Sequence, residues 1–202
     1  MILSNVRLQE ALKSGSLVIE PRPQPDFPSD DNIECPYQTS AVDLRLGDEI
    51  LCFRKKLPVS IDLRVGGFSA LADAISERWR FPQGQPYTLK HGEFVLGRTL
   101  ERIALPIAKH TSSRPCLAAR IEGRSSYSRC GLLVHFTAPT IHAGYDGIIT
   151  LEICNFGPYS IELHKGACIC QLIVEEVAGI PFRNDSQFHG QRSPDGTVDN
   201  QQ

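Results

Sequence analysis

Short apolar runs, each closed by a turn, constrain the fold of this chain more than any other feature of its sequence. From residue 87 onward these runs alternate with Gly, Pro and Asn residues that favour turns, at spacings of roughly eight to twelve residues. Such a series of short strands predicts a mainly β protein, either a barrel or a sandwich, with a few short helices. The runs lie at 87–90, 93–99, 116–121, 132–136, 148–155, 160–163 and 167–175.

The first part of the chain predicts two helices and a pair of strands. Ser4 can cap a helix that ends near Gly15, and Ser69 can cap a second helix that runs to about Arg80. Residues 40–53 alternate as two strands joined by a tight turn at Gly47, which is the pattern of a hairpin.

The length and charge of the chain limit its domain count and its partners. With 202 residues, it is expected to form one β domain over residues 1–181. The polar segment 182–202 is expected to be a flexible C-terminal arm. A net charge of -2 gives no general basic field, so nucleic acid is not an expected partner and any anion site must be local.

Hydropathy and cysteine usage predict a cytoplasmic protein. No run approaches the roughly eighteen apolar residues that a membrane span needs, so no membrane partner is expected. Arg7 and Lys13 lie in an amphipathic N-terminal pattern without the apolar stretch of a secretory signal. Seven scattered cysteines, an odd number, favour a reducing compartment over a disulfide framework.

The segment Gly123-Arg124-Ser125-Ser126 has the composition of an anion-binding turn. It offers a flexible backbone, a forked cation and two hydroxyls in consecutive positions, which are the donors that a phosphate needs. The alternative is a polar turn that precedes a strand and binds nothing, because short motifs of this kind often occur by chance.

Residues 148–155 predict an inner strand that carries one carboxylate. Alternation places Ile148, Thr150, Glu152 and Cys154 on one face and three apolar residues on the other, so both faces are largely apolar. A glutamate there is costly unless it is paired or used in chemistry. The alternative to a functional role is a structural pair between Glu152 and an arginine, Arg124 or Arg129.

These two stretches, with two others, resemble the dCTP deaminase branch of the dUTPase superfamily. That family shows G-R-S-S-x-x-R-x-G, a V-H-x-T-A segment, an I-D-x-G-aromatic-x-G turn and L-E-x-x-N, in this order and at similar spacing. Weaker similarity extends from residue 1 to about residue 191. The four motifs stand here at residues 123–131, 134–138, 141–147 and 151–155.

The resemblance implies a distorted jelly roll or β-barrel of the dUTPase type, assembled as a homotrimer with active sites between subunits. It implies hydrolysis of dCTP to dUTP and ammonia, with dCTP and dUTP as ligands and dTTP as a possible inhibitor. Mg²⁺ is expected to be bound through the triphosphate. Zinc is not expected, because the H-x-E and P-C-x-x-C signature of zinc nucleobase deaminases is absent.

The resemblance also assigns roles to individual residues. Glu152 would take a proton from the attacking water and return it to the exocyclic nitrogen, while Arg129 holds it in place. Ser125 and the carbonyl of Ala138 would orient the water and the amine, and the arm would close over the triphosphate. The residues assigned to catalysis are Glu152, Ser125, Arg129 and Ala138; those assigned to nucleotide binding are Arg124, Ser126, Thr137, Ile141, His142, Tyr145, Phe182, Gln187 and Gln191.

Departures from the family pattern leave three hypotheses open. His142 stands where the family usually has the Asp that activates water for diphosphate hydrolysis, and Gln187 stands where the arm usually has a Lys. The first hypothesis is a dCTP deaminase that releases dUTP. The second is a bifunctional deaminase and dUTP diphosphatase, or a plain diphosphatase, in which His142 replaces the Asp. The third is a relative that senses nucleotides without turning them over.

Overall fold

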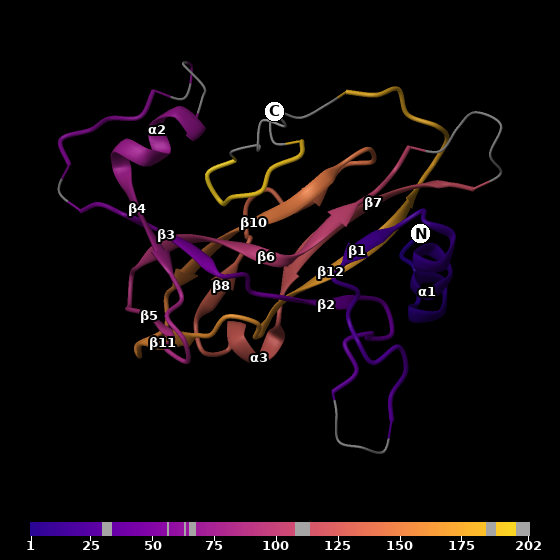
Figure 1. The fold of residues 1–202 in the computed structure, drawn as a ribbon, viewed down its shortest axis with the longest axis horizontal. Coiled ribbons are helices and arrows are strands. Elements are labelled where there is room, and N and C mark those ends of the chain that lie inside the picture. The colour runs from indigo at the N-terminus through magenta and orange to yellow at the C-terminus, as the bar shows by residue number, and fades with distance from the viewer. Residues whose placement is uncertain are drawn as a thin grey trace.

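The computed structural model describes residues 1–29, 34–55, 57–62, 64, 68–107, 114–184 and 189–196, and it is built mainly of β-strands (Figure 1). The expected mainly β architecture is confirmed. The expected closed barrel is not observed, because no sheet that the described residues form closes on itself. The six-stranded sheet has the order β4 (Ser76–Arg80), β3 (Glu49–Phe53), β6 (Phe94–Ala104), β10 (Asp146–Asn155) and β8 (Leu132–Val134), and β1 (Val18–Glu20) also pairs with β6.

Two smaller sheets and three helices complete the described part of the chain. One apolar core cluster draws on strands of both larger sheets and on the first helix, so these parts form a single folding unit. No helix of the described residues is long and apolar enough to cross a membrane. The four-stranded sheet has the order β2 (Val42–Arg45), β12 (Cys168–Val177), β7 (Cys116–Gly123) and β9 (Thr140–Ile141); β11 (Ile161–Leu163) pairs with β5 (Tyr87–Leu89); the helices are α1 (Asn5–Ser14), α2 (Phe68–Ile75) and α3 (Ser125–Ser128).

The first predicted helix is confirmed, and the second is half wrong. Ser4 caps α1 by accepting the amide of Arg7, and Gly15 ends it with φ 73°. The second helix stops at Ile75, because residues 76–80 form β4 and pair residue for residue with β3. Trp79 on β4 packs edge-on against Phe81 and Tyr87, with ring centroids 4.6 and 5.1 Å apart, and such aromatic packing favours the extended backbone.

The predicted hairpin over residues 40–53 is wrong, because its two strands belong to different sheets. Strand β2 pairs with β12, whereas β3 pairs with β4 and β6. The chain turns this corner at Gly47, whose amide donates to the carbonyl of Arg98 at 2.8 Å. A β-carbon at Gly47 would lie within 3.2 Å of the Arg98 and Thr99 carbonyl oxygens, so the close crossing of the two sheets requires glycine.

Strand β10 is the inner strand that its sequence predicts. Ile149, Leu151 and Ile153 point into the core, as the alternation predicted, and β6 and β8 flank the strand. The pairing with β6 shifts register between Ile148 and Thr150, and the amide of Ile149 there donates to the hydroxyl of buried Thr99 at 2.9 Å. Thr150 and Glu152 lie on the face of β10 away from the core.

The end of β10 is tied to the segment that follows α3. The carboxamide of fully buried Asn155 donates to the carbonyls of Leu89 and Tyr159, at 3.0 and 2.8 Å, and accepts the amide of Gly157 at 2.9 Å. The amide of Phe156 donates to the carbonyl of Gly131 at 2.8 Å. The asparagine of the L-E-x-x-N motif therefore has a structural role in this fold.

Replacing Gly131 with Ala should destabilise the protein strongly. Gly131 has φ 89°, and a β-carbon there would overlap the backbone of Gly157, which the hydrogen bonds of Asn155 hold in place. We expect Gly131→Ala to lower the free energy of unfolding in urea by about 3 kcal/mol or more. Gly84→Ala is the matched control, because Gly84 also has positive φ but has open space around it, and it should cost about 1 kcal/mol. Equal losses for both variants would contradict the close contact.

Candidate active site

A cavity of about 540 Å³ lies where β10 and β6 meet α2, the 135–145 segment and the C-terminal residues. Its walls come from five parts of the chain that are far apart in sequence. In Figure 1 the C-terminal segment, in yellow, passes close to β10 and runs toward α2 at the top of the view. The lining residues are Phe53, Phe68, Phe94, Leu96, His135, Ala138, Thr140, Ile141, His142, Ala143, Gly144, Tyr145, Ile149, Thr150, Glu152, Arg183, Asn184, His189, Gln191 and Pro194.

Glu152 is the one carboxylate among these lining residues. It lies on β10 opposite Leu96 of β6 and is half-buried. The hydroxyl of Thr137 donates to Glu152 Oε2 at 3.0 Å, and the amide of His135 donates to the Glu152 carbonyl at 2.7 Å. No arginine of the described residues pairs with this carboxylate, so the structural Arg–Glu pair considered from the sequence is not formed within one chain.

His135 holds the carbonyl of Ala138 at the cavity wall. Its Nε2 lies 2.9 Å from the Ala138 oxygen, and since a carbonyl only accepts, Nε2 carries the hydrogen. The His135 backbone has φ 54°, the one positive value at a non-glycine residue among the described residues, and the side chain is 9% exposed. Its Nδ1 is buried without a hydrogen-bond partner among the described residues. Residue-by-residue assignment missed His135, although it stands in the quoted V-H-x-T-A motif.

β9 and the turn after it also line the cavity and contain three predicted site residues. Ile141 is buried, His142 is exposed at the wall, and Tyr145 is half-buried. The Tyr145 hydroxyl donates to the Ile148 carbonyl and accepts from Gln191 Nε2 at 3.1 Å. Burial raises the pKa of Tyr145 to about 12, so the hydroxyl stays protonated near neutral pH.

The C-terminal segment 189–196, which we call the strap, closes one side of the cavity. Gly190 donates its amide to the Asp146 carbonyl at 2.7 Å, and Gln191 Nε2 donates to the Ile148 carbonyl at 2.8 Å. Of the arm residues assigned to nucleotide binding, Gln191 thus lines the cavity. Phe182 is 88% exposed and does not line it, and Gln187 lies outside the described residues.

The predicted anion turn does not line this cavity. Ser125, Ser126 and Arg129 lie on or next to α3, with exposed side chains that make no hydrogen bond in the described part of the chain. In Figure 1 α3 lies at the bottom of the view and α2 at the top. One chain therefore brings Glu152, Thr137, Ala138 and the 141–145 turn together, and leaves Ser125 and Arg129 apart from them.

Arg124, also predicted to bind phosphate, is held by acids of its own chain. It donates to Glu34 at 2.8 Å, lies 3.7 Å from Asp43, and stacks over the Tyr127 ring with 5.6 Å to its centroid. Asp43 is 1% exposed and also accepts from Gln171 at 2.9 Å, so it holds an arginine and an amide side chain.

An aromatic wall next to Glu152 was not foreseen from the sequence. Phe53 and Phe94 stack with ring centroids 5.5 Å apart and planes at 22°, and Phe68 approaches Phe53 at 6.5 Å. The three residues lie on β3, β6 and α2, and no local motif connects such distant positions. Among the described residues, no group of three or more His, Cys, Asp and Glu side chains could hold a metal ion.

The arrangement suits proton transfer beside a planar, partly apolar ligand. A carboxylate held by a hydroxyl can accept a proton and return it, and the Ala138 carbonyl can accept a hydrogen from an amino group. Arg183, His142 and His189 line the cavity as basic groups, which favours an anionic end on the ligand.

A family model described as dCTP deaminase-like matches residues 2–177. A dCTP deaminase, dUMP-forming, from Dictyoglomus thermophilum is 35% identical over 199 residues, covering 96% of this chain and 92% of the relative. A dCTP deaminase from Halorubrum lacusprofundi is 35% identical over 178 residues, covering 88% of this chain and 78% of the relative. The crystal structure of 2'-deoxycytidine 5'-triphosphate deaminase from Agrobacterium tumefaciens superposes with TM-score 0.59 at 19% identity, which shows the shared fold; the match covers 87% of this chain and 48% of that one.

Tyr145→Phe should remove one phenol that titrates far above the usual range. Because burial raises the pKa of Tyr145 to about 12, its neutral form is favoured in the folded state. Its stabilising contribution is therefore complete below about pH 10 and is lost as the pH rises toward 12. Absorbance titration at 295 nm should show a late phase that is smaller by one tyrosine in Tyr145→Phe, because burial also raises the pKa of Tyr37 and of Tyr87 and these keep their own late titration. Tyr159→Phe is the control, since the Tyr159 side chain is exposed. A late phase of unchanged amplitude in Tyr145→Phe would contradict the assignment.

Proposed function

The chain belongs to the dCTP deaminase-like family, and on that premise we propose that it hydrolyses dCTP to dUTP and ammonia. The observation that supports this most is Glu152, the one carboxylate among the described residues that line the cavity, held by Thr137 beside the Ala138 carbonyl. The walls around it are apolar and aromatic, as a nucleoside requires. The proposal includes a cytoplasmic location and no partner other than nucleotides and further copies of the chain.

In the proposed reaction Glu152 carries a single proton from water to the leaving amine. Glu152 removes a proton from water as the oxygen bonds to C4 of cytosine, which gives a tetrahedral intermediate. It then returns a proton to the exocyclic nitrogen, the C4–N bond breaks, and ammonia leaves. The second water hydrogen moves to N3 of the ring as the C4 oxygen becomes the carbonyl of uracil. The carbonyl of Ala138, fixed by His135, accepts a hydrogen bond from the amine or the water.

The exposed side chains of α3 motivate the proposal of a homotrimer with shared sites. Ser125 and Arg129 have no side-chain partner among the described residues, while Glu152 has the Thr137 hydroxyl and no cation. We assign the missing donors to α3 of a neighbouring copy: Ser125 orients the water, Arg129 holds Glu152, and Ser126 contributes to phosphate binding.

The remaining cavity walls are assigned to the sugar and the triphosphate. Ile141 and Tyr145, which line the cavity, would pack against the deoxyribose and leave no room for a 2′-hydroxyl, while Gln191 and the rest of the arm would lie toward the phosphates. Mg²⁺ would be bound through the triphosphate, whose charge it neutralises. Inhibition by dTTP would use the same walls.

The identity of residue 142 is our reason for choosing between dUTP and dUMP as the released product, and this residue is His142. One relative is named dUMP-forming, whereas the name of another, dCTP deaminase, states no product. A second hydrolysis needs a base that activates water against the α-phosphate, and the imidazole of His142 replaces the carboxylate that the family usually has there. We therefore favour dUTP as the released product. The dUMP-forming relative keeps the bifunctional alternative in view, and a nucleotide-binding protein without turnover is the third.

Glu152→Gln should abolish ammonia release and leave the binding of dCTP intact. The amide keeps the size of the side chain but cannot take up the proton, so kcat should fall by at least about 100-fold. Ammonia release and dCTP binding by calorimetry measure the two effects. Thr137→Val, which removes only the hydrogen bond at 3.0 Å, should lower kcat by about tenfold.

Mixed assemblies provide the control for this prediction. Chains carrying Glu152→Gln and chains carrying Arg129→Ala, inactive alone, should regain part of the activity when co-expressed, because some sites combine an intact Glu152 with an intact α3. Normal deamination by Glu152→Gln would contradict the mechanism. The absence of recovery in correctly assembled mixtures would contradict the shared site.

His142→Asp should add a second hydrolysis to the reaction. Wild-type protein given dCTP and Mg²⁺ should accumulate dUTP, whereas His142→Asp should also release dUMP and pyrophosphate, because a carboxylate can activate the second water. Chromatography of the nucleotides follows both products. His142→Asn is the matched control, since it has nearly the size of Asp but no basic carboxylate. Pyrophosphate release by the wild type would instead make the enzyme bifunctional.

A further inference from the structure

We propose that Arg78 acts through Asp195 as a latch that keeps the strap docked, and that the latch sets the affinity of the cavity for its ligand. Arg78 is thus a positioning residue that does not touch the substrate. The identity of the ligand as dCTP rests on the function proposed above, whereas the latch itself does not.

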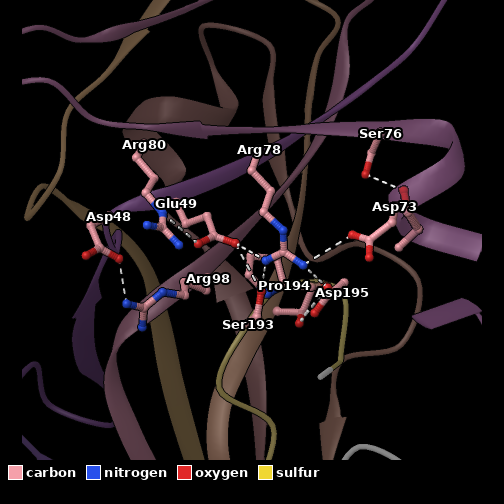
Figure 2. Close-up of polar contacts among 12 residues, drawn as sticks. Asp48, Glu49, Asp73, Ser76, Arg78, Arg80, Arg98, Ser193, Pro194 and Asp195 are labelled. Atoms are coloured by element: carbon pink, nitrogen blue, oxygen red, sulfur yellow. Dashed lines mark hydrogen bonds and ion pairs between the residues drawn. The ribbon is translucent and has the colours of Figure 1, made fainter. Parts of the chain in front are cut away.

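Arg78 on β4 connects β3 and the strap through one guanidinium group (Figure 2). Its Nη1 donates to Glu49 Oε1 at 2.7 Å and to the Ser193 hydroxyl at 2.8 Å, and its Nη2 pairs with the Asp195 carboxylate. The Ser193 hydroxyl in turn donates to Glu49 Oε1 at 3.0 Å. One cation therefore joins an acid of the sheet and an acid of the strap.

Burial separates this network from ordinary surface ion pairs. The Asp195 side chain is 1% exposed, Glu49 10% and Arg78 34%. An exposed pair contributes little, but a buried carboxylate that loses its cation is strongly disfavoured. Without Arg78, the strap would have to bury Asp195 without this cation or leave its place. Both acids also raise the pKa of Arg78, outweighing the opposing effect of its burial, so its charge is permanent at every usable pH.

Backbone contacts extend the latch to the elements around the cavity. The hydroxyl of Ser69 on α2 donates to the Asp195 carbonyl at 2.6 Å, and that of Thr150 on β10 donates to the Pro194 carbonyl at 3.3 Å. Ser69 follows Phe68 of the aromatic wall, and Thr150 lies two residues before Glu152. The docked strap therefore bridges the two sides of the site.

The strap and the ligand share the same wall. His189, Gln191 and Pro194 line the cavity, and Gln191 also fixes the hydroxyl of Tyr145. If only the docked strap completes this wall, the apparent dissociation constant rises in inverse proportion to the docked fraction. Weakening the latch should raise KM and leave the proton transfer at Glu152 nearly unchanged.

Limited trypsin digestion tests docking without reference to activity. The bond after Arg192 lies within the strap, and release of residues 193–202 can be followed by mass spectrometry. We expect Arg78→Met to speed this cleavage, and to raise KM for dCTP by about tenfold with less than a threefold change in kcat. Asp195→Asn, which leaves no buried charge on the strap, should have the smaller effect and should add little to Arg78→Met.

Arg80→Met is the matched control. Arg80 lies two residues away on the same strand and approaches the same Glu49 at 3.5 Å, but its side chain is 77% exposed. It should change neither cleavage nor KM. Unchanged cleavage and KM in Arg78→Met, or equal effects of Arg80→Met, would overturn the latch. If Arg78→Met does not fold by circular dichroism, Asp195→Asn replaces it in the test. Cleavage of Asp195→Asn that is faster than cleavage of the wild type supports the latch, and unchanged cleavage overturns it.

The proposed function and the latch can be tested separately, because either can be wrong while the other is right. Faster cleavage of Arg78→Met, in a protein whose wild type does not turn over dCTP, would support the latch and contradict the deaminase. Normal turnover of dCTP by the wild type, with unchanged cleavage and KM in Arg78→Met, would support the deaminase and contradict the latch.

Discussion

The whole arrangement depends on holding one carboxylate in a strand whose other face is hydrophobic core. Glu152 can occupy β10 because Ile149, Leu151 and Ile153 anchor that strand from the opposite side, while β6 and β8 bond both of its edges. A bulge on β6 lies opposite Ile149, and the buried Thr99 hydroxyl there accepts the Ile149 amide. A strand fixed in this way cannot rotate to turn the Glu152 carboxylate toward solvent. Neighbouring groups must therefore provide the hydrogen-bond donors of this carboxylate.

Those surroundings come from parts of the chain that meet only in the folded state. The His135–Ala138 contact, the 141–145 turn, the three phenylalanines and the strap each belong to a different segment. Most of their polar contacts involve backbone carbonyls, which stay in place when side chains change. The charged side chains of the network around Arg78 lie outside the cavity lining, where they hold its walls together.

Local patterns in the sequence predicted the parts of the fold that local physics determines. The cap of α1 and the two faces of β10 follow from capping and alternation, and both are confirmed. The boundary between α2 and β4 and the corner at Gly47 depend on partners distant in sequence, so propensity alone gave a longer helix and a hairpin. For the site, the motifs located Glu152, Ala138 and the 141–145 turn. Neither the aromatic wall nor the contact between Arg78 and Asp195 leaves a local signal.

The left-handed backbone at His135 limits which residues can replace this histidine. Gly or Asn would adopt φ 54° more easily, but neither carries a ring nitrogen that reaches the Ala138 carbonyl. A β-branched residue would lose both the turn and the hydrogen bond. Few single substitutions of His135 can therefore be neutral. A protein that loses this histidine must also change the adjoining loop.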